Sequence, residues 1–240
     1  MSATTRRTVR VLGSVIALLM VLTAAYSATA QASRHTGTTT HELSAGLTSV
    51  ELVNDVGSVL VVPVAAGERP RAVVTATGGF REPGVDVVGS GESVTLAGSC
   101  PSSVWFRPCD VQWQLHLPAD AAVSVRTSVG DVTVAGVGTT VHAETSVGVV
   151  TVDDVSAQTV TALSSVGDVV VDVDVPPSDL TATTSTGNVV VTVPDGGTTY
   201  RVRSGTSIGT VTNSVPVDAA SPHHLEALTS IGDVTLRLGG

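Results

Sequence analysis

One pentapeptide of this 240-residue chain has the pattern of a catalytic motif. Gly205-Thr206-Ser207-Ile208-Gly209 matches the Gly-x-Ser-x-Gly nucleophile elbow of hydrolases, which needs a strand before the serine and a helix after it. No helical period follows the pentapeptide, which is also one copy of the repeat described below. We therefore assign no catalytic residue and predict that the protein is not an enzyme.

Carboxylates and imidazoles are the second group that could do chemistry, as metal ligands. The acids share two positions of the repeat, one occupied by Asp131, Asp168 and Asp233 and the other by Asp153, Asp154, Asp172 and Asp174. Stacked layers would bring such acids within reach of one calcium ion, but the glycine-rich nonapeptide of calcium-loaded β-rolls is absent. His223-His224 has no cysteine or acid at ligand spacing, and His116 and His142 lie elsewhere. We predict no metal site and no cofactor, with calcium at the acids as the alternative.

The third group is a short segment between two cysteines. In an exported protein Cys100 and Cys109 would normally be paired, and closing this loop would stabilise the fold by roughly 2.7 kcal/mol on the chain-entropy estimate. The loop contains Trp105 and Phe106, and Trp113 follows it. Adjacent aromatic side chains on a tied loop are either an exposed anchor for a partner or a cover over an open end of the fold. We favour the cover; if the loop is exposed, these three aromatic residues are the candidate partner-binding site.

A repeated unit must position all these residues. A twelve-residue pattern that turns on a Ser-x-Gly step occurs six times between Val123 and Leu236. Its glycines are Gly130, Gly148, Gly167, Gly187, Gly209 and Gly232, at spacings of 18, 19, 20, 22 and 23 residues. A valine always stands two residues after the glycine, and a valine or leucine always stands seven before it. The apolar period is two on each side of the glycine with a phase shift of one at the glycine, which indicates two strands that meet at a corner.

One unit cannot bury its own apolar face, so the copies must stack, at about 4.8 Å per layer. The segment from Val50 to Val61, around Gly57, fits as a seventh, divergent copy, and three or four irregular layers would fill the interval from Pro63 to Pro118. Insertions are confined to the connections between units, which are 6, 7, 8, 10 and 11 residues long. We predict an all-β, single-domain β-solenoid over residues 47–240, a parallel β-helix-like stack of layers of 18–23 residues.

The repeat also predicts a column of serines beside the corner. Its members are Ser128, Ser146, Ser165, Ser185, Ser207 and Ser230. Such hydroxyls usually satisfy local backbone groups in turns. The alternative is a binding face for ice or polysaccharide, but the aromatic platforms typical of sugar-binding sites are missing from the sequence.

Residues 1–32 have the three parts of an export signal: Arg6, Arg7 and Arg10, an apolar run over 11–25, and small residues up to Ala32. Uncleaved, the stretch 11–30 would be just long enough to cross a bilayer as an N-terminal helical anchor. We favour cleavage, but in both cases the domain lies outside the membrane, secreted or at the cell surface. Residues 33–46 are expected to form a polar spacer.

Composition agrees with an extracellular location. The chain has no lysine, and its 12 arginines stand against 21 acids, a net charge of −9. So acidic a surface repels phosphate backbones, which excludes nucleic acid as a partner. The expected partner is a protein or envelope component of unknown identity, and the membrane itself if the N-terminal helix is retained.

One segment of the sequence in particular resembles a known protein family. Leu117-Pro118-Ala119-Asp120-Ala121-Ala122-Val123 leads into Thr127-Ser128-Val129-Gly130-Asp131-Val132, and further Ser-x-Gly steps follow. This is similar to the bacterial putative-adhesin family, a β-solenoid domain of unknown function related to the toast-rack domains of envelope-stress proteins. The resemblance covers residues 43–240 and implies placement at the surface or membrane; it supplies no catalytic residue. The sequence therefore favours an adhesin-like interaction or structural module, then a membrane-tethered stress sensor or scaffold, and third a polysaccharide-active enzyme.

Overall fold

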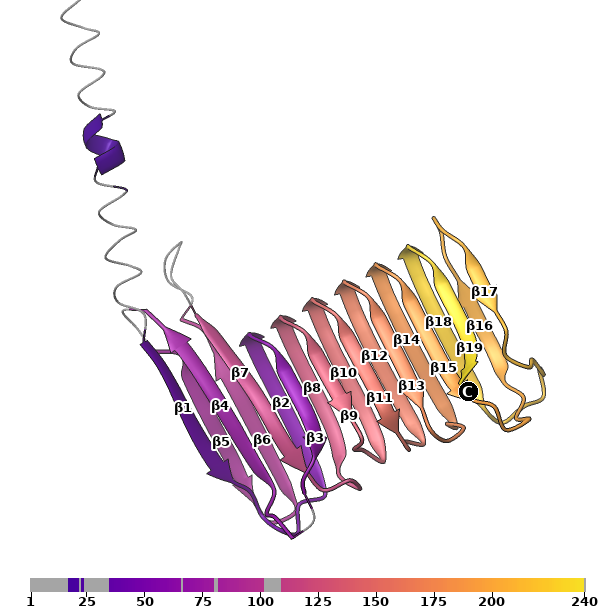
Figure 1. Cartoon of the computed structure of the whole chain (residues 1–240), viewed down its shortest axis with the longest axis horizontal. Coiled ribbons are helices and arrows are strands. Elements are labelled where there is room, and N and C mark those ends of the chain that lie inside the picture. The colour runs from indigo at the N-terminus through magenta and orange to yellow at the C-terminus, as the bar shows by residue number, and fades with distance from the viewer. Residues whose placement is uncertain are drawn as a thin grey trace, which may run out of the picture.

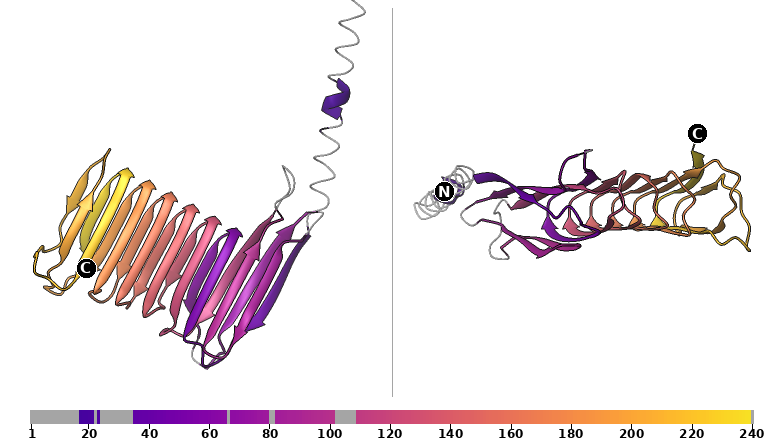
Figure 2. Two further views of the ribbon diagram at one scale, coloured as in Figure 1. Left: turned by 180° about the vertical axis from the view of Figure 1, so that it is seen from behind. Right: turned by 90° about the horizontal axis from the view of Figure 1, so that it is seen from below.

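The computed structural model describes residues 17–21, 23, 35–65, 67–79, 82–101 and 109–239. Its strands form two long sheets that face each other along the whole stack (Figures 1 and 2). The ten-stranded sheet has the order β1 (His35–Glu42), β4 (Arg71–Gly78), β7 (Asp110–Leu117), β3 (Val59–Pro63), β9 (Val132–Ala135), β11 (Val150–Val155), β13 (Val169–Val173), β15 (Val189–Pro194), β19 (Val234–Gly239), β17 (Val211–Asn213). The nine-stranded sheet has the order β16 (Arg201–Gly205), β18 (His224–Ile231), β14 (Asp179–Thr186), β12 (Thr159–Val166), β10 (Thr140–Val147), β8 (Ala122–Val129), β2 (Ser49–Val56), β6 (Ser93–Ser99), β5 (Gly84–Ser90).

Each repeat unit contributes one strand to each sheet. In the unit of Gly130, for example, β8 belongs to the nine-stranded sheet and β9 to the ten-stranded sheet, and the two strands face each other through their side chains. Hydrogen-bonded ladders therefore run between layers, and through the repeats they are parallel and in register, with Val141 beside Val123 and Val160. The inward side chains of the inner layers are buried, as the alternating pattern predicts, so the predicted β-solenoid fold is confirmed. Each turn of this solenoid has two strands, one in each sheet.

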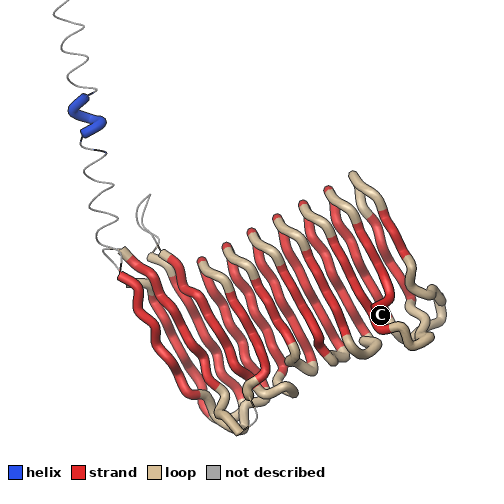
Figure 3. Tube along the Cα trace, in the orientation of Figure 1, coloured by secondary structure: helices blue, strands red, loops and turns tan. Residues whose placement is uncertain are grey.

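Turns are confined to the two long edges of the stack (Figure 3). We call the edge that carries the repeat glycines the corner edge, and the edge where one unit passes to the next the connection edge. The corner glycines, including Gly57, all have positive φ, between 130° and 150°. A Cβ on Gly167 would collide with the backbone carbonyl of Gly148 in the adjoining layer, and the other repeat glycines meet the same obstacle. Glycine is thus required both by its conformation and by the close approach of the layers.

The N-terminal end differs from its prediction in two ways. The interval 63–118 does not lie between the divergent copy around Gly57 and the six repeat units, because β2 and β3 of that copy pair directly with β8 and β9. The strands of the interval instead continue the sheets on the far side of that copy, where β4 and β5 pair antiparallel with their neighbours. The segment 33–46 is also not a spacer throughout, because His35–Glu42 forms β1, paired with β4. Its threonines alternate with no apolar residues, so no periodic pattern reveals this strand.

The C-terminal end has a different order from the sequence. The sixth unit, β18 and β19, lies between the fourth and fifth units: β18 pairs with both β14 and β16, and β19 with both β15 and β17. The fifth unit is therefore the outermost layer. Its position explains why Val211 is 43% exposed although the equivalent valines of the other five repeat units are buried.

Most of the predicted export signal lies outside the described residues. Residues 17–21 and 23 are helical, and Leu18, Leu19, Met20 and Val21 in this stretch are exposed. Within the described ranges, no helix has the length and hydropathy needed to span a membrane.

Candidate functional site

The corner edge holds the largest regular group of polar side chains. Three residues before each repeat glycine stands a buried or half-buried threonine or serine, whose hydroxyl donates a hydrogen bond to the glycine carbonyl of the adjoining layer. These bonds are Thr127 to Gly57 (3.4 Å), and Thr145 to Gly130, Ser164 to Gly148, Thr184 to Gly167, Thr229 to Gly187 and Thr206 to Gly232 (2.9 Å each). The ladder satisfies carbonyls that the sharp corner turns away from the sheets. These hydroxyls are therefore structural.

The predicted serine column lies one position further along and faces solvent. In the described part of the chain none of its six hydroxyls makes a hydrogen bond to the protein. The hydrogen bonds to backbone carbonyls that were expected of these serines are made instead by the hydroxyls three residues before each glycine. Beside it stands a second exposed column, formed by the residue just before each glycine. Its aliphatic members are Val129, Val147, Val166, Ile208 and Ile231, which are 45–65% exposed. The corner edge thus presents an exposed row of serines beside an exposed row that is mainly aliphatic.

The corner acids cap backbone groups of neighbouring layers. A carboxylate oxygen of Asp131 accepts a hydrogen bond from the Val149 amide at 2.8 Å, and Asp168 accepts one from the Asn188 amide at 2.7 Å. Asp233 accepts two at 2.8 Å, from the amide and the hydroxyl of Thr210, and these bonds lower its pKa. Each acid is therefore engaged in holding two layers together.

The other acidic group lies on the connection edge. Asp154, Asp172, Asp174 and Asp195 line an open hollow of about 580 Å³. Partial burial, followed by the charges of Asp153 and Asp154, raises the pKa of Asp172. Across the described residues no three His, Cys, Asp or Glu side chains are grouped as metal ligands. The structure thus brings these acids to the connection edge, where three of them line the hollow together with Asp195.

The histidines are dispersed. His223 makes a 2.7 Å hydrogen bond through Nδ1 to the Pro177 carbonyl and packs edge-on against buried Tyr200, while His224 is exposed. His142 contacts Glu144 at 3.3 Å on the outer face of the nine-stranded sheet. His116 lies on β7, at the opposite end of the stack from His223, and its pKa is lowered chiefly by partial burial.

The Gly205–Gly209 segment runs from β16 to the corner before β17. A strand, not a helix, follows Ser207, and Ser207 belongs to the exposed serine column. The geometry of a nucleophile elbow is therefore absent from this segment.

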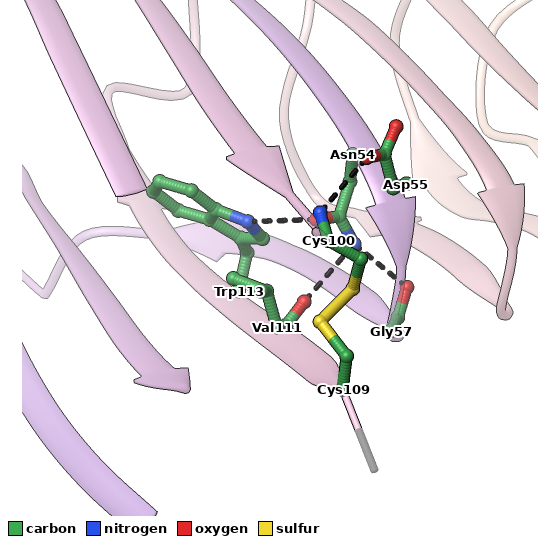
Figure 4. The surroundings of a disulfide bond; sticks show 7 residues. All are labelled: Asn54, Asp55, Gly57, Cys100, Cys109, Val111 and Trp113. Atoms are coloured by element: carbon green, nitrogen blue, oxygen red, sulfur yellow. Dashed lines mark hydrogen bonds between the residues drawn. A yellow bond between two sulfur atoms is a disulfide. The ribbon is translucent and has the colours of Figure 1, made fainter. Parts of the chain in front are cut away.

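The disulfide predicted from the sequence is present. Cys100 and Cys109 are joined with their Cα atoms 5.9 Å apart, and the Cys100 amide donates a 2.9 Å hydrogen bond to Asp55 (Figure 4). The bridge joins the end of β6 to the start of β7 across the two sheets. The predicted partner-site residues Trp105 and Phe106 lie in 102–108, outside the described residues.

Trp113, which was predicted as part of the partner site, is buried in the core. It is only 2% exposed, and its indole Nε1 donates a 3.3 Å hydrogen bond to Oδ1 of buried Asn54. The Asn54 amide in turn donates to the carbonyls of Gly57 and Val111, both at 3.0 Å (Figure 4). Trp113 alternates inward on β7 between Val111 and Leu115, so its indole belongs to the core.

Asn54 is a residue that the sequence analysis missed. It stands three residues before Gly57, at the position that holds threonine or serine in the later copies. The layer beyond it is irregular, so its longer amide reaches two carbonyls and the indole at once. A strictly recurring hydroxyl three residues before glycine, replaced once by asparagine, is the sequence signal that could have identified it.

A shallow hollow of about 400 Å³ lies on the outer face of the ten-stranded sheet, where the parallel layers meet the antiparallel strands. Leu60, Val73, Gln112, Gln114 and Thr133 contribute to its lining. The lining combines amide, hydroxyl and aliphatic groups with the carboxylate of Asp131, which also accepts the hydrogen bond from the Val149 amide. This hollow can accept hydrogen bonds from a polar ligand and donate them to it.

The structure is similar to solved bacterial proteins. A putative cell adhesion protein from Clostridium sporogenes matches with a TM-score of 0.54 and 11% sequence identity, over 86% of this chain and 100% of that chain. A putative adhesin from Bacteroides fragilis has a TM-score of 0.45 and 15% identity, over 85% of this chain and 97% of that chain. No protein-family model matches the sequence, and no curated protein matches it. The chain thus shares the fold of the Clostridium sporogenes protein, which confirms at the level of fold the resemblance drawn from its repeats.

Proposed function

We propose that this protein is an exported, non-enzymatic interaction module that acts in adhesion at the cell surface. The observation that carries the proposal is the Cys100–Cys109 disulfide, which lies in the irregular N-terminal part of the stack and closes a segment whose sequence contains two adjacent aromatic residues. A disulfide of this kind persists in oxidising compartments outside the cytosol. The lysine-free, acidic composition and the apolar run over 11–25 support the same compartment.

The internal use of the polar side chains supports a binding role over catalysis. The hydroxyls of the corner ladder and the carboxylates of Asp131, Asp168 and Asp233 are bound to neighbouring layers. The proposed partner contacts are the long outer surface of the stack and the segment between Cys100 and Cys109. Aromatic side chains on such a loop would supply most of the binding energy.

The test replaces Trp105 and Phe106 together with alanine and measures both binding to cells and thermal unfolding. If the loop is the partner site, binding is lost while the melting temperature hardly changes. Gln114→Ala, in the hollow on the outer face, serves as the control for binding elsewhere. Unchanged binding by the double variant, or a large fall in melting temperature, would contradict the role of the loop; the second result would show that it is a cover.

A membrane-tethered sensor or scaffold is the second candidate, favoured by the position of β1. Among the described residues the sheet begins at His35, so at most residues 31–34 separate it from the apolar stretch that ends at Ala30, and four residues can span at most about 14 Å. A retained N-terminal segment would hold the domain close to the bilayer. Mass spectrometry of the native protein separates the candidates: an N-terminus at Gln31 or Ser33 favours secretion, and an intact chain in the membrane fraction favours the sensor.

A further inference from the structure

The hollow of about 400 Å³ on the outer face of the ten-stranded sheet has the size of a small-molecule site, for which volumes of about 300–1,000 Å³ are typical. Four strands line it, in the order β4, β7, β3, β9, and each of them has a paired strand on both sides. Their backbone groups are used within the sheet, so a peptide could not join this surface as a further strand. Recognition in this hollow therefore depends on side chains.

The outward side chains form two rows across these strands. The strand registers place Gln114 between Val73 of β4 and Leu60 of β3, and they place Leu60 beside Thr133 of β9. The second row, nearer the corner edge, consists of Thr75, Gln112, Ser58 and Asp131. Neighbouring strands are about 4.8 Å apart, so each row spans about 14 Å. The two glutamines lie two residues apart on one strand, and both belong to the outer face.

The two glutamine amides offer complementary groups. Gln112 donates a 2.8 Å hydrogen bond to Asp110, which leaves its carbonyl oxygen as an acceptor, whereas in the described part of the chain Gln114 makes no side-chain hydrogen bond. A trans amide presents its N–H and its C=O in opposite directions, so it needs an acceptor on one side and a donor on the other. Gln112 and Gln114 can supply these two partners to one ligand amide.

Apolar surface stands directly beside this pair of amides. Leu60 is 36% exposed and Val73 is half-buried, and the two flank Gln114 in its row. A methyl group attached to the carbonyl of a ligand amide would lose water against these aliphatic side chains. The combination matches an acetamido group, which carries an N–H, a C=O and a methyl group.

The rest of the lining favours an uncharged, hydroxyl-rich ligand. Asp131 is the one charged side chain among the described lining residues, so a phosphate, sulfate or carboxylate group would find repulsion and no cation. The hydroxyls of Ser58, Thr75 and Thr133 can both donate and accept hydrogen bonds, as the hydroxyls of a sugar ring do.

We propose that this hollow binds an uncharged sugar that carries an acetamido group. Gln114 donates to the acetamido carbonyl, Gln112 accepts from its N–H, and the methyl group packs on Leu60. The second row contacts the hydroxyls of the ring. The site goes beyond the adhesive role proposed above, because it does not involve the segment between Cys100 and Cys109.

Nuclear magnetic resonance of the exported protein tests the site with two matched probes. The β-1,4-linked tetramers of N-acetylglucosamine and of glucose differ in the acetamido group. Because the chain has four glutamines, single variants assign the side-chain amide signals of Gln112 and Gln114. We expect the acetylated tetramer to shift these signals and to bind about tenfold more tightly than the glucose tetramer, since two neutral hydrogen bonds are gained.

Gln114→Leu keeps the size of the side chain and removes its amide. It should lower the affinity for the acetylated tetramer about tenfold and abolish the preference over the glucose tetramer, with an unchanged melting temperature. Thr235→Ala, on the outer face of β19 and away from the hollow, should bind like the unchanged protein.

Three results with these probes would overturn the proposal: equal binding of the two tetramers, no shift of the Gln114 signal up to the solubility limit of the acetylated tetramer, or full binding by Gln114→Leu. An N-acetylated tetra-alanine amide that binds as tightly as the sugar would also overturn it, because the ligand would then be a peptide. The Trp105 and Phe106 double variant should keep the sugar site. Loss of cell binding by that variant and failure of the sugar titration are therefore separate results.

Discussion

The hydroxyl of Thr229 donates a 2.9 Å hydrogen bond to the carbonyl of Gly187, although 42 residues separate the two in the chain. In the other inner layers the same bond joins consecutive units, as from Thr184 to Gly167. The long separation arises because the fifth unit, which is the outermost layer, precedes in the sequence the sixth unit, which lies between the fourth and the fifth. The fifth unit thus rests on the sixth, through Thr206 and the Gly232 carbonyl at 2.9 Å.

Truncation should reveal this dependence. A chain that ends at residue 220 lacks β18 and β19, with which β16 and β17 pair in the described part of the chain. We expect residues 195–220 to become rapidly cleaved in limited proteolysis, while residues 122–194 remain protected. If 195–220 stayed as resistant as in the full chain, the fifth unit would have packed directly on the fourth, contrary to the layer order described.

Replacing a corner glycine should be costly for two separable reasons. Gly167→Ala adds a Cβ that meets the Gly148 carbonyl and also strains a φ of 145°. We expect a loss of about 3 kcal/mol or more in the free energy of unfolding, measured by denaturant titration.

Two glycines of one loop provide matched controls. Gly197 has a φ of 73° but open space around its Cβ position, and Gly196 has open space without a positive φ. Gly197→Ala should cost about 1 kcal/mol, and Gly196→Ala close to nothing. Equal losses at 167 and 197 would mean that the approach of the layers contributes little.

The buried hydroxyl ladder can be tested with an isosteric change. Thr184→Val keeps the shape of the side chain but leaves the Gly167 carbonyl without its 2.9 Å donor. The expected cost is about 1–2 kcal/mol, seen as a fall of a few degrees in melting temperature. Thr181→Val, on the outer face of the same strand, should be near neutral. A stabilising effect of Thr184→Val would show that the hydroxyl is not needed at the corner.

The core and the outer column should respond very differently to substitution. Val169 is fully buried between Val150 and Val189 of the adjoining layers, so Val169→Asp would place a charge in the core without a partner. We expect a loss of about 4 kcal/mol or more. Ser165→Ala in the exposed serine column should cost less than about 0.5 kcal/mol. Similar shifts in melting temperature for the two variants would contradict the assignment of the faces.

The acidic hollow gives a prediction about pH. The raised pKa of Asp172 means that the folded chain holds this proton more tightly than the unfolded chain. Its ionisation therefore lowers stability as pH rises from the unfolded pKa of about 3.9 through the higher folded value. Asp172→Asn should raise the melting temperature at pH 7, and the gain should shrink toward pH 3.5. A gain of the same size at both pH values would exclude the ionisation of Asp172, which burial and then the neighbouring carboxylates disfavour, as its cause.

Several features of the fold could be predicted because one physical requirement recurs in every layer. Val132 and its counterparts are buried in five of the six repeat units, and Gly130 and its counterparts need a conformation that other residues resist. The order of the last two layers was not predicted, although two signals pointed to it. The fifth unit has Asn213 where every other unit has valine or leucine, which suits an outermost layer. The connections before and after this unit, of 10 and 11 residues, are also the longest between units.

Less of the candidate site could be predicted. The pairing of Cys100 with Cys109 followed from the compartment and the short spacing. The role of Trp113 did not, because its inward position depends on the register of β7 beside β3, a pairing of segments far apart in sequence. The strand β1 gave no signal at all, since a strand exposed on both faces needs no alternation of apolar and polar residues.

The return of the last unit beneath the fifth also affects how such a chain can change in length. Both ends of the stack are fixed by strands that arrive out of order, whereas the layers from β8 to β15 follow one another in sequence and share one register. A duplication or deletion of a whole unit among them would leave the contacts of either end intact. An extra unit added after Gly239 would instead have to compete for a place that is already filled. Evolutionary changes in the length of this stack are therefore expected to arise by gain or loss of units between β8 and β15.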